Sequence, residues 1–135
     1  MATILRAHIV LAVPDLDRSR RWYEAVLGCV ADEVDPGNWV FMARDGLVFM
    51  LGRCPDAIPV PDLGDHQYVA YLVVDDVDAF HGIAAAAMPE FGGAILKPPR
   101  DEAWGMREMA LRTADGHRLM LATNIEPENP PHGPG

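Results

Sequence analysis

The chain has 135 residues, and its 11 Lys and Arg against 20 Asp and Glu give a formal net charge of −9 at pH 7. A surface this acidic repels phosphate backbones, so the composition excludes an electrostatic nucleic-acid binder. Half of the residues are hydrophobic, which is enough to fill the core of a single domain of this length.

The first part of the chain has the pattern of one strand, one helix and three strands. The apolar, β-branched run Ile9–Val13 is typical of a strand buried on both faces. A helix capped by Asp15 or Asp17 follows, with apolar residues at helical spacing until Gly28 ends it. Three strands separated by Asp- and Gly-containing turns are then expected at 29–33, 39–44 and 47–53.

A Pro-rich stretch at 54–65 is expected to be a linker, after which the same order of elements returns. A strand is expected at 68–74 and a helix at 77–88, ended by Pro89 with Gly92 and Gly93. Three more strands are expected at 94–97, 107–112 and 118–122, with a loop at 98–106 between the first two. The Pro- and Gly-rich tail from 124 onward is expected to be disordered.

Two short motifs recur in the same order in the two halves. The segment PDLD at 14–17 matches DDVD at 75–78, and DGL at 45–47 matches DGH at 115–117. Shared order favours an internal duplication over chance recurrence. We therefore expect an α+β fold of two strand-helix-three-strand modules in one domain over 1–123, with module one at 4–53, the linker at 54–65, module two at 66–123 and the tail at 124–135.

Membrane, redox and common catalytic motifs are missing from the sequence. No apolar run approaches the roughly 18 residues of a membrane span. The two cysteines, Cys29 and Cys54, lack a paired spacing of the metal or redox kind. There is no nucleophile elbow, phosphate-binding glycine loop or dinucleotide fingerprint. We expect a soluble, cytoplasmic protein.

The duplicated module resembles the vicinal oxygen chelate superfamily, the group of glyoxalase I, extradiol dioxygenases and bleomycin-resistance proteins. The resemblance spans 8–122 and is carried by HIVLAVPDL at 8–16, RRWY at 20–23, LG at 27–28 and VVDDVDA at 73–79. The segment WGMREMALR at 104–112, with DG at 115–116, resembles the bleomycin-resistance branch in particular. The resemblance implies that the modules form a curved mixed sheet around a concave cup, with the helices outside. These positions mostly build caps, turns and core, so they identify fold better than function.

In metal-dependent members of this superfamily, each module supplies two metal ligands. The matching positions here are His8, Met50, Val69 and Met120. Valine and methionine do not hold zinc, iron or manganese, so the usual metal site is expected to be absent, with no cofactor and no catalytic residue assigned. A strand histidine satisfied by a polar neighbour is favoured for His8 over a catalytic base.

Strand alternation from those four positions places mostly apolar side chains on the inner faces, with one histidine and no carboxylate. Trp39 and Trp104 suit stacking on a planar ligand, and Tyr71 either bonds a ligand or closes a core polar contact. Ordinary core packing is the alternative for all of them. The candidate ligand-binding residues are His8, Trp39, Phe41, Met50, Tyr71, Trp104, Met106, Arg118 and Met120.

Three functions are weighed. The favoured one is a metal-independent binding protein, resembling bleomycin-resistance proteins, that sequesters an aromatic ligand in an apolar cup. The acidic charge suits a cationic ligand, although it also serves solubility. The alternative is a glyoxalase-like isomerase or lyase, or a dioxygenase, with a divalent metal on atypical ligands, which the replaced positions disfavour. The third is a subunit whose apolar face meets another protein.

The expected partners follow from the same resemblance. A small-molecule ligand is expected, with no nucleic acid and no membrane. The resemblance also implies a homodimer, and the linker leaves open whether the modules are exchanged between chains.

Overall fold

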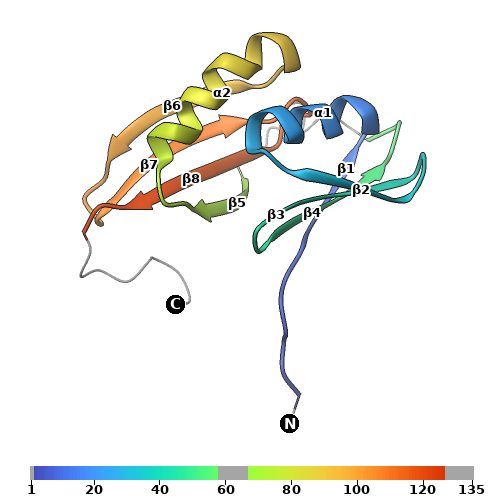
Figure 1. The fold of residues 1–135 in the computed structure, drawn as a ribbon, viewed down its shortest axis with the longest axis horizontal. Coiled ribbons are helices and arrows are strands. Elements are labelled where there is room, and N and C mark those ends of the chain that lie inside the picture. Colours follow the sequence, from blue (N-terminus) through green and yellow to red (C-terminus); the bar gives the residue numbers. More distant parts are fainter. Residues whose placement is uncertain (1, 58–66, 127–135) are drawn as a thin grey trace.

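The computed structural model of the chain describes residues 2–57 and 67–126, which form two modules of identical element order (Figure 1). Module one contains β1 (Ile9–Val13), α1 (Leu16–Leu27), β2 (Val30–Asp35), β3 (Trp39–Arg44) and β4 (Leu47–Arg53). Module two contains β5 (Tyr68–Val73), α2 (Val77–Phe91), β6 (Ala94–Asp101), β7 (Met106–Arg112) and β8 (Arg118–Asn124). The predicted α+β fold of duplicated βαβββ modules is confirmed.

Each module forms its own four-stranded mixed sheet. The strand order is β1-β4-β3-β2 in the first sheet and β5-β8-β7-β6 in the second. The first strand of each module pairs in parallel with the last, as Ile9 with Phe49 and Leu72 with Leu121, and the other pairs are antiparallel. The two sheets therefore repeat one topology, and β1 and β5 are equivalent edge strands.

Both helices begin at an aspartate cap. The side chain of Asp15 accepts the backbone N–H of Arg18 at 3.1 Å, and Asp76 accepts that of Ala79 at the same distance. Of the two predicted caps for α1, Asp15 rather than Asp17 is used. The helix ends at Gly28, whose φ of 68° is a left-handed conformation that suits glycine. With 12 and 15 residues, neither helix of the described ranges is long and apolar enough to cross a membrane.

The predicted end of the second helix at Met88 is wrong. Pro89 lies inside the last turn, and α2 continues to Phe91. A proline there removes one N–H bond close to the end of the helix. Phe91 packs against the core, and the N–H of Gly92 bonds the carbonyl of Met88 at 2.9 Å, so tertiary contacts and the C-cap outweigh that loss.

The strand predicted at 94–97 is longer, and the loop predicted at 98–106 is shorter. β6 runs through Pro98 and Pro99 to Asp101. Proline is tolerated because β6 is an edge strand, where N–H groups on the outer side need no strand partner. The connection to β7 is consequently a tight turn at 102–105, closed by the N–H of Gly105, which donates to the carbonyl of Glu102 at 3.2 Å.

Most of the predicted linker and tail lies outside the described residues.

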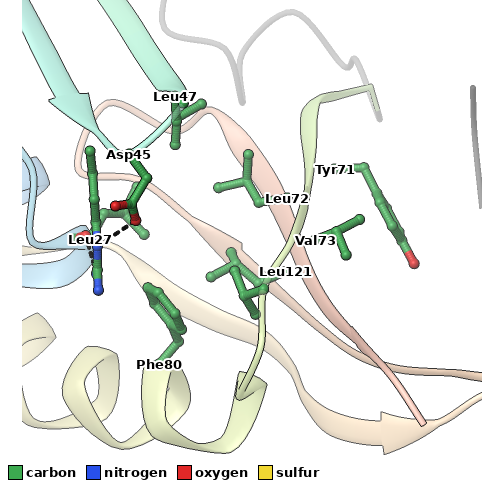
Figure 2. Close-up of a pocket in the computed structure, with 11 residues that line it drawn as sticks. Leu27, Asp45, Leu47, Tyr71, Leu72, Val73, Phe80 and Leu121 are labelled. Atoms are coloured by element: carbon green, nitrogen blue, oxygen red, sulfur yellow. Dashed lines mark hydrogen bonds and ion pairs between the residues drawn. The ribbon is translucent and has the colours of Figure 1, made fainter. Parts of the chain in front are cut away.

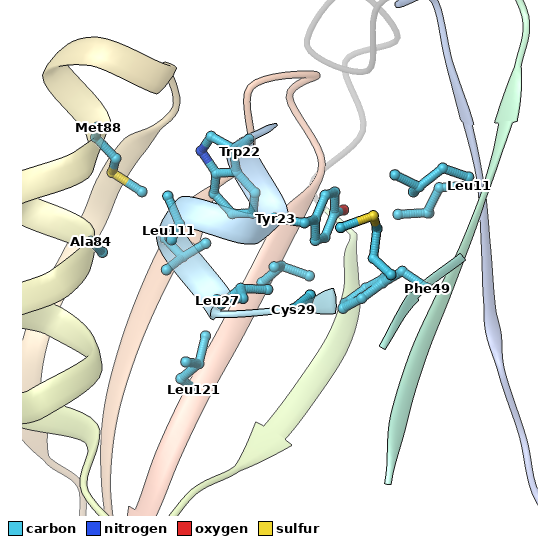
Figure 3. Close-up of a cluster of buried hydrophobic side chains, with 14 of the residues drawn as sticks. Leu11, Trp22, Tyr23, Leu27, Cys29, Phe49, Ala84, Met88, Leu111 and Leu121 are labelled. Atoms are coloured by element: carbon cyan, nitrogen blue, oxygen red, sulfur yellow. The ribbon is translucent and has the colours of Figure 1, made fainter. Parts of the chain in front are cut away.

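Helix α1 is buried on two sides and joins the modules. Trp22 and Tyr23 are both fully buried, and Figure 3 shows Tyr23 pointing toward Phe49 while Trp22 lies on the α2 side. The rings of Tyr23 and Phe49 are 4.8 Å apart between centroids. The Nε1 of Trp22 donates to the carbonyl of Gly92 in module two at 2.9 Å. One helix thus supplies core to both modules.

A polar contact ties the same helix to the β7–β8 turn. The carboxylate of Asp115, whose side chain is only 2% exposed, accepts the hydroxyl of Ser19 at 2.6 Å and the guanidinium of Arg18 at 2.9 Å. Hydrogen bonds to a charged acceptor are stronger than neutral ones, particularly where the acceptor is buried. The start of α1 is therefore held against module two as well.

Replacing Gly93 tests the junction between the modules. A Cβ at this position would lie 2.5 Å from the carbonyl of Arg112 and 2.8 Å from Nε1 of Trp22, and φ is +89°. We expect Gly93→Ala to lower the free energy of unfolding by about 2 kcal/mol or more, measured by urea denaturation. Gly82→Ala is the control, because nothing lies within 4 Å of that helical position; it should raise stability by about 0.5–1 kcal/mol. Equal effects would contradict this account.

Candidate ligand-binding site

Each sheet has one face covered by helices and one face turned away from them, here called the open face. In β4, Phe49 and Leu51 are fully buried on the covered face, whereas Met50 between them is half-buried. In β8, Leu119 and Leu121 are buried and Met120 is half-buried. The predicted alternation places these methionines on the open faces, as the structure shows.

The open face of the first sheet is mostly apolar and carries Trp39, with the exposed Asp32 of β2 opposite Phe41. Phe41 lies opposite Met50 in the strand register, and Trp39 lies opposite Gly52. A Cβ on Gly52 would meet the Trp39 ring at 2.8 Å, so the indole rests directly on the glycine. Trp39 is 37% exposed. The structure therefore brings three predicted binding residues together and leaves part of a flat ring accessible.

His8 does not join that group. It lies immediately before β1 on an exposed segment, and no side chain of the described residues hydrogen-bonds to it. The expected strand histidine with a polar neighbour is therefore not what the structure contains. The adjoining Ile4 and Leu5 are also almost fully exposed.

The open face of the second sheet is organised around Glu108, which is only 3% exposed. Its Oε2 accepts the hydroxyl of Tyr71 at 2.6 Å and Nε1 of Trp104 at 2.8 Å. Its Oε1 accepts Nζ of Lys97 at 3.4 Å. Of the two roles predicted for the hydroxyl of Tyr71, the structure shows the polar contact within the protein. The two rings remain 38% and 47% exposed, respectively.

The prediction that no carboxylate lies on an inner face is wrong because of the exposed Asp32 opposite Phe41 in the first sheet and, above all, because of the buried Glu108. This residue is opposite Ala122 in the register, on the same face as Tyr71. The alternation from His8, Met50, Val69 and Met120 covers only the strands that hold those four positions, and β7 is not one of them. In that strand, the buried covered-face residues Met109 and Leu111 alternate with Glu108, and this pattern was the available signal.

The charges around Glu108 compensate one another. Lys97 also donates to Glu102 at 3.0 Å, and Arg100 donates to Glu102 at 2.9 Å. Two cations and two carboxylates therefore form one cluster. Burial, followed by the hydrogen bond to the Glu108 carboxylate, raises the pKa of Tyr71 above its usual range. The phenol consequently stays protonated and acts as a donor to Glu108.

The remaining predicted residues are distributed over the second sheet. Met120 lies opposite Tyr71 and is half-buried, and Arg118 lies opposite Arg112. Met106 is almost completely buried, so its side chain offers little surface to a ligand.

The positions that match family metal ligands do not fit a divalent ion. Val69 packs against the hydrophobic core, because the register shifts between Tyr68 and Ala70. Met50 and Met120 are thioethers on different sheets, and the imidazole of His8 is the one nitrogen donor of the set. Within residues 2–57 and 67–126, no three His, Cys, Asp or Glu side chains cluster as a metal site would require.

An apolar cavity of about 330 Å³ lies at the junction between the modules (Figure 2). Its lining combines β5 and Phe80 of α2 with the β3–β4 turn. Arg44 also lines it, with its guanidinium carbon 4.9 Å from the centroid of the Phe80 ring and Nη1 donating to the carbonyl of Leu27 at 2.8 Å. Figure 2 shows the hydroxyl of Tyr71 directed away from the other lining side chains. Sequence patterns did not predict this cavity, because distant segments of the chain form it.

Comparison with known proteins decides the family. A model described as the Glyoxalase/Bleomycin resistance protein/Dioxygenase superfamily matches residues 6–121. The chain belongs to this superfamily. The predicted resemblance is therefore confirmed over most of the sequence. A search of curated proteins finds no match.

Several solved structures share the superfamily fold with this chain. TioX from Micromonospora sp. ML1 is 25% identical, with a TM-score of 0.66 and coverage of 87% of this chain and 98% of TioX. The bleomycin-binding protein of Streptomyces verticillus, solved with copper(II)-bleomycin, is 24% identical, with a TM-score of 0.67 and coverage of 90% and 97%. The fosfomycin resistance protein FosX from Listeria monocytogenes is 17% identical, with a TM-score of 0.68 and coverage of 91% and 94%.

The contact between the Trp39 ring and Gly52 on the first open face can be tested by substitution of the glycine. Gly52→Ala places a methyl against the indole, so we expect the ring to tilt away from the sheet and acrylamide quenching of its fluorescence to increase. The measurement is made in a Trp104→Phe background. The two remaining tryptophans are then Trp39 and Trp22, and Trp22 is fully buried, so acrylamide quenching reports on Trp39. Gly46→Ala is the control, because nothing lies within 4 Å of that turn position. Equal quenching in both variants would contradict the contact.

Proposed function

We propose that this protein binds and sequesters a flat aromatic small molecule without a metal ion. The observation that carries the proposal is the exposure of Trp39, Tyr71 and Trp104 on open faces, away from the hydrophobic core. Burying a large aromatic ring against a planar ligand is favourable, and tryptophan and tyrosine lose little conformational entropy in doing so. These rings are the parts of the chain best suited to hold a ligand.

The donor chemistry supports binding without catalysis. The metal positions of the family hold one imidazole, two thioethers and a valine here, and Glu108 is already hydrogen-bonded to three donors. The shared fold of the bleomycin-binding protein, which was solved with copper(II)-bleomycin, adds support for a ligand of this kind. The net charge of −9 favours encounter with a cationic ligand. Cys29 and Cys54 are both free thiols, which supports a cytoplasmic location.

We further propose a homodimer in which module one of each chain faces module two of its partner. No strand of the first sheet pairs with the second sheet among the described residues, so β1 and β5 each keep a free edge. The modules of one chain meet instead through α1 and the residues around Gly92 and Asp115. A second copy would bring the Trp39 face of one chain to the Glu108 face of the other.

Titration with copper(II)-bleomycin, followed by tryptophan fluorescence, tests the binding function. We expect saturable quenching, and Trp39→Ala and Trp104→Ala should each weaken binding by about tenfold, because aromatic anchors dominate such interfaces. Ile83→Ala is the control, since that side chain is exposed on α2. Purified protein that retains stoichiometric divalent metal, lost in His8→Ala, would contradict metal-independent binding and favour the enzyme alternative.

Mixing two defective chains tests the exchanged dimer. A site built from Trp39 of one chain and Trp104 of its partner is restored in half of the sites of a Trp39→Ala and Trp104→Ala heterodimer. After subunits are mixed and re-equilibrated, about a quarter of all sites should regain wild-type affinity. Calorimetric titration before and after mixing measures this fraction. If both tryptophans came from one chain, no site would recover.

A further inference from the structure

The two exposed rings of the second sheet share a single hydrogen-bond acceptor. Tyr71 comes from β5 and Trp104 from the turn before β7, and β8 lies between β5 and β7. Both donors nevertheless reach Oε2 of Glu108, at 2.6 and 2.8 Å. Ala122 of β8 lies opposite Glu108, and its small side chain leaves room for the phenol to cross that strand.

The carboxylate and the two rings differ in solvent exposure, which indicates different roles. Glu108 is 3% exposed, whereas Tyr71 and Trp104 are 38% and 47% exposed. The carboxylate therefore lies beneath the rings, where it contributes almost no surface of its own. Because the O–H of Tyr71 and Nε1–H of Trp104 already donate to it, a ligand on this face meets the flat faces of the rings.

The carboxylate acceptor also affects which ligands bind to the faces of the Tyr71 and Trp104 rings. Hydrogen bonds polarise their partners in a low-dielectric setting, so a ring that donates to an anion becomes richer in electrons. Electron-rich aromatic faces attract cations. The two rings above Glu108 are consequently suited to a planar ligand that carries positive charge.

The basic side chains near Glu108 leave this preference intact. Lys97 and Arg100 both pair with Glu102, so the cluster of two cations and two carboxylates has no net charge. Arg112 and Arg118 lie opposite one another in the register, four residues along their strands from Glu108 and Ala122. At the rise of a β-strand, the backbones of these arginines lie roughly 13 Å from Glu108 and roughly 7 Å from Met120, which is opposite Tyr71. The preference for cations should therefore be strongest around Trp104.

We propose that Glu108 is a positioning residue that fixes Tyr71 and Trp104 and makes their surface select planar cations, such as N-alkylated heteroaromatic rings, over neutral rings of the same shape. The inference rests on the proposed function and narrows its ligand class. Glu108 acts through the rings and does not touch the ligand.

Two matched probes test the selectivity. N-methylquinolinium is a planar cation, and quinoline at pH 8 is its neutral counterpart. We expect wild-type protein to bind the cation about fivefold more tightly in calorimetric titrations, within the usual range for cations over aromatic rings. Glu108→Gln should bring the ratio of affinities close to one. Glu102→Gln removes the same unit charge from the same cluster and keeps the hydrogen bonds of both rings to Glu108, so its ratio should stay above that of Glu108→Gln.

A second readout monitors the rings without any ligand. The near-ultraviolet circular dichroism of Trp104 should weaken more in Glu108→Gln than in Glu102→Gln, because Glu108 accepts the indole N–H at 2.8 Å. Urea denaturation checks that both variants fold. Tyr71→Phe removes only the hydroxyl donor and keeps the ring, so it replaces Glu108→Gln if the latter does not fold, and it should also lower the ratio.

The outcomes separate this inference from the proposed function. If wild type binds both probes and Glu108→Gln keeps the ratio of Glu102→Gln, the inference is wrong and the binding function stands. Quenching by copper(II)-bleomycin without uptake of either probe also overturns the inference. If wild type responds to neither probe nor copper(II)-bleomycin, the proposed function itself fails.

Discussion

The rest of the structure depends on the burial of helix α1 on two sides. Tyr23 packs into the core of the first sheet, and its neighbour Trp22 reaches the carbonyl of Gly92 in module two. Because adjacent residues on a helix point about 100° apart, one helix can serve both modules. This arrangement requires a glycine at position 93, because a Cβ there would overlap both the Arg112 carbonyl and the indole of Trp22.

This arrangement explains why each sheet keeps an open face. The helices are used to join the modules, so they cover one side of each sheet, and alternate strand residues remain on the other side. The two open faces differ in chemistry. The first supports Trp39 on a glycine and is mostly apolar, whereas the second holds its rings on a buried carboxylate.

Membership of the superfamily accounts for the scaffold rather than for the chemistry. Where metal-dependent relatives require ligands, this chain has Met50, Val69 and Met120. The polar chemistry is found instead on β7, at Glu108, where it organises aromatic side chains.

The sequence by itself determined the features that depend on neighbouring residues. The duplication, an aspartate cap at Asp15 or Asp17, the glycine end at Gly28 and the alternation that places Met50 on an open face were all predicted, because caps, turns and strand period are local. Likewise, Trp39 and Trp104 were identified as candidates, although their role in binding stays a prediction.

Only the tertiary structure decided which distant residues meet. Tyr71 and Glu108 are 37 positions apart and touch because β8 inserts between β5 and β7 in the sheet. Pro98 and Pro99 are accepted in a strand because β6 is at an edge, and α2 runs past Pro89 because Phe91 packs on the core. Strand order, edges and core contacts are set by packing across the whole chain, which local sequence preferences do not encode.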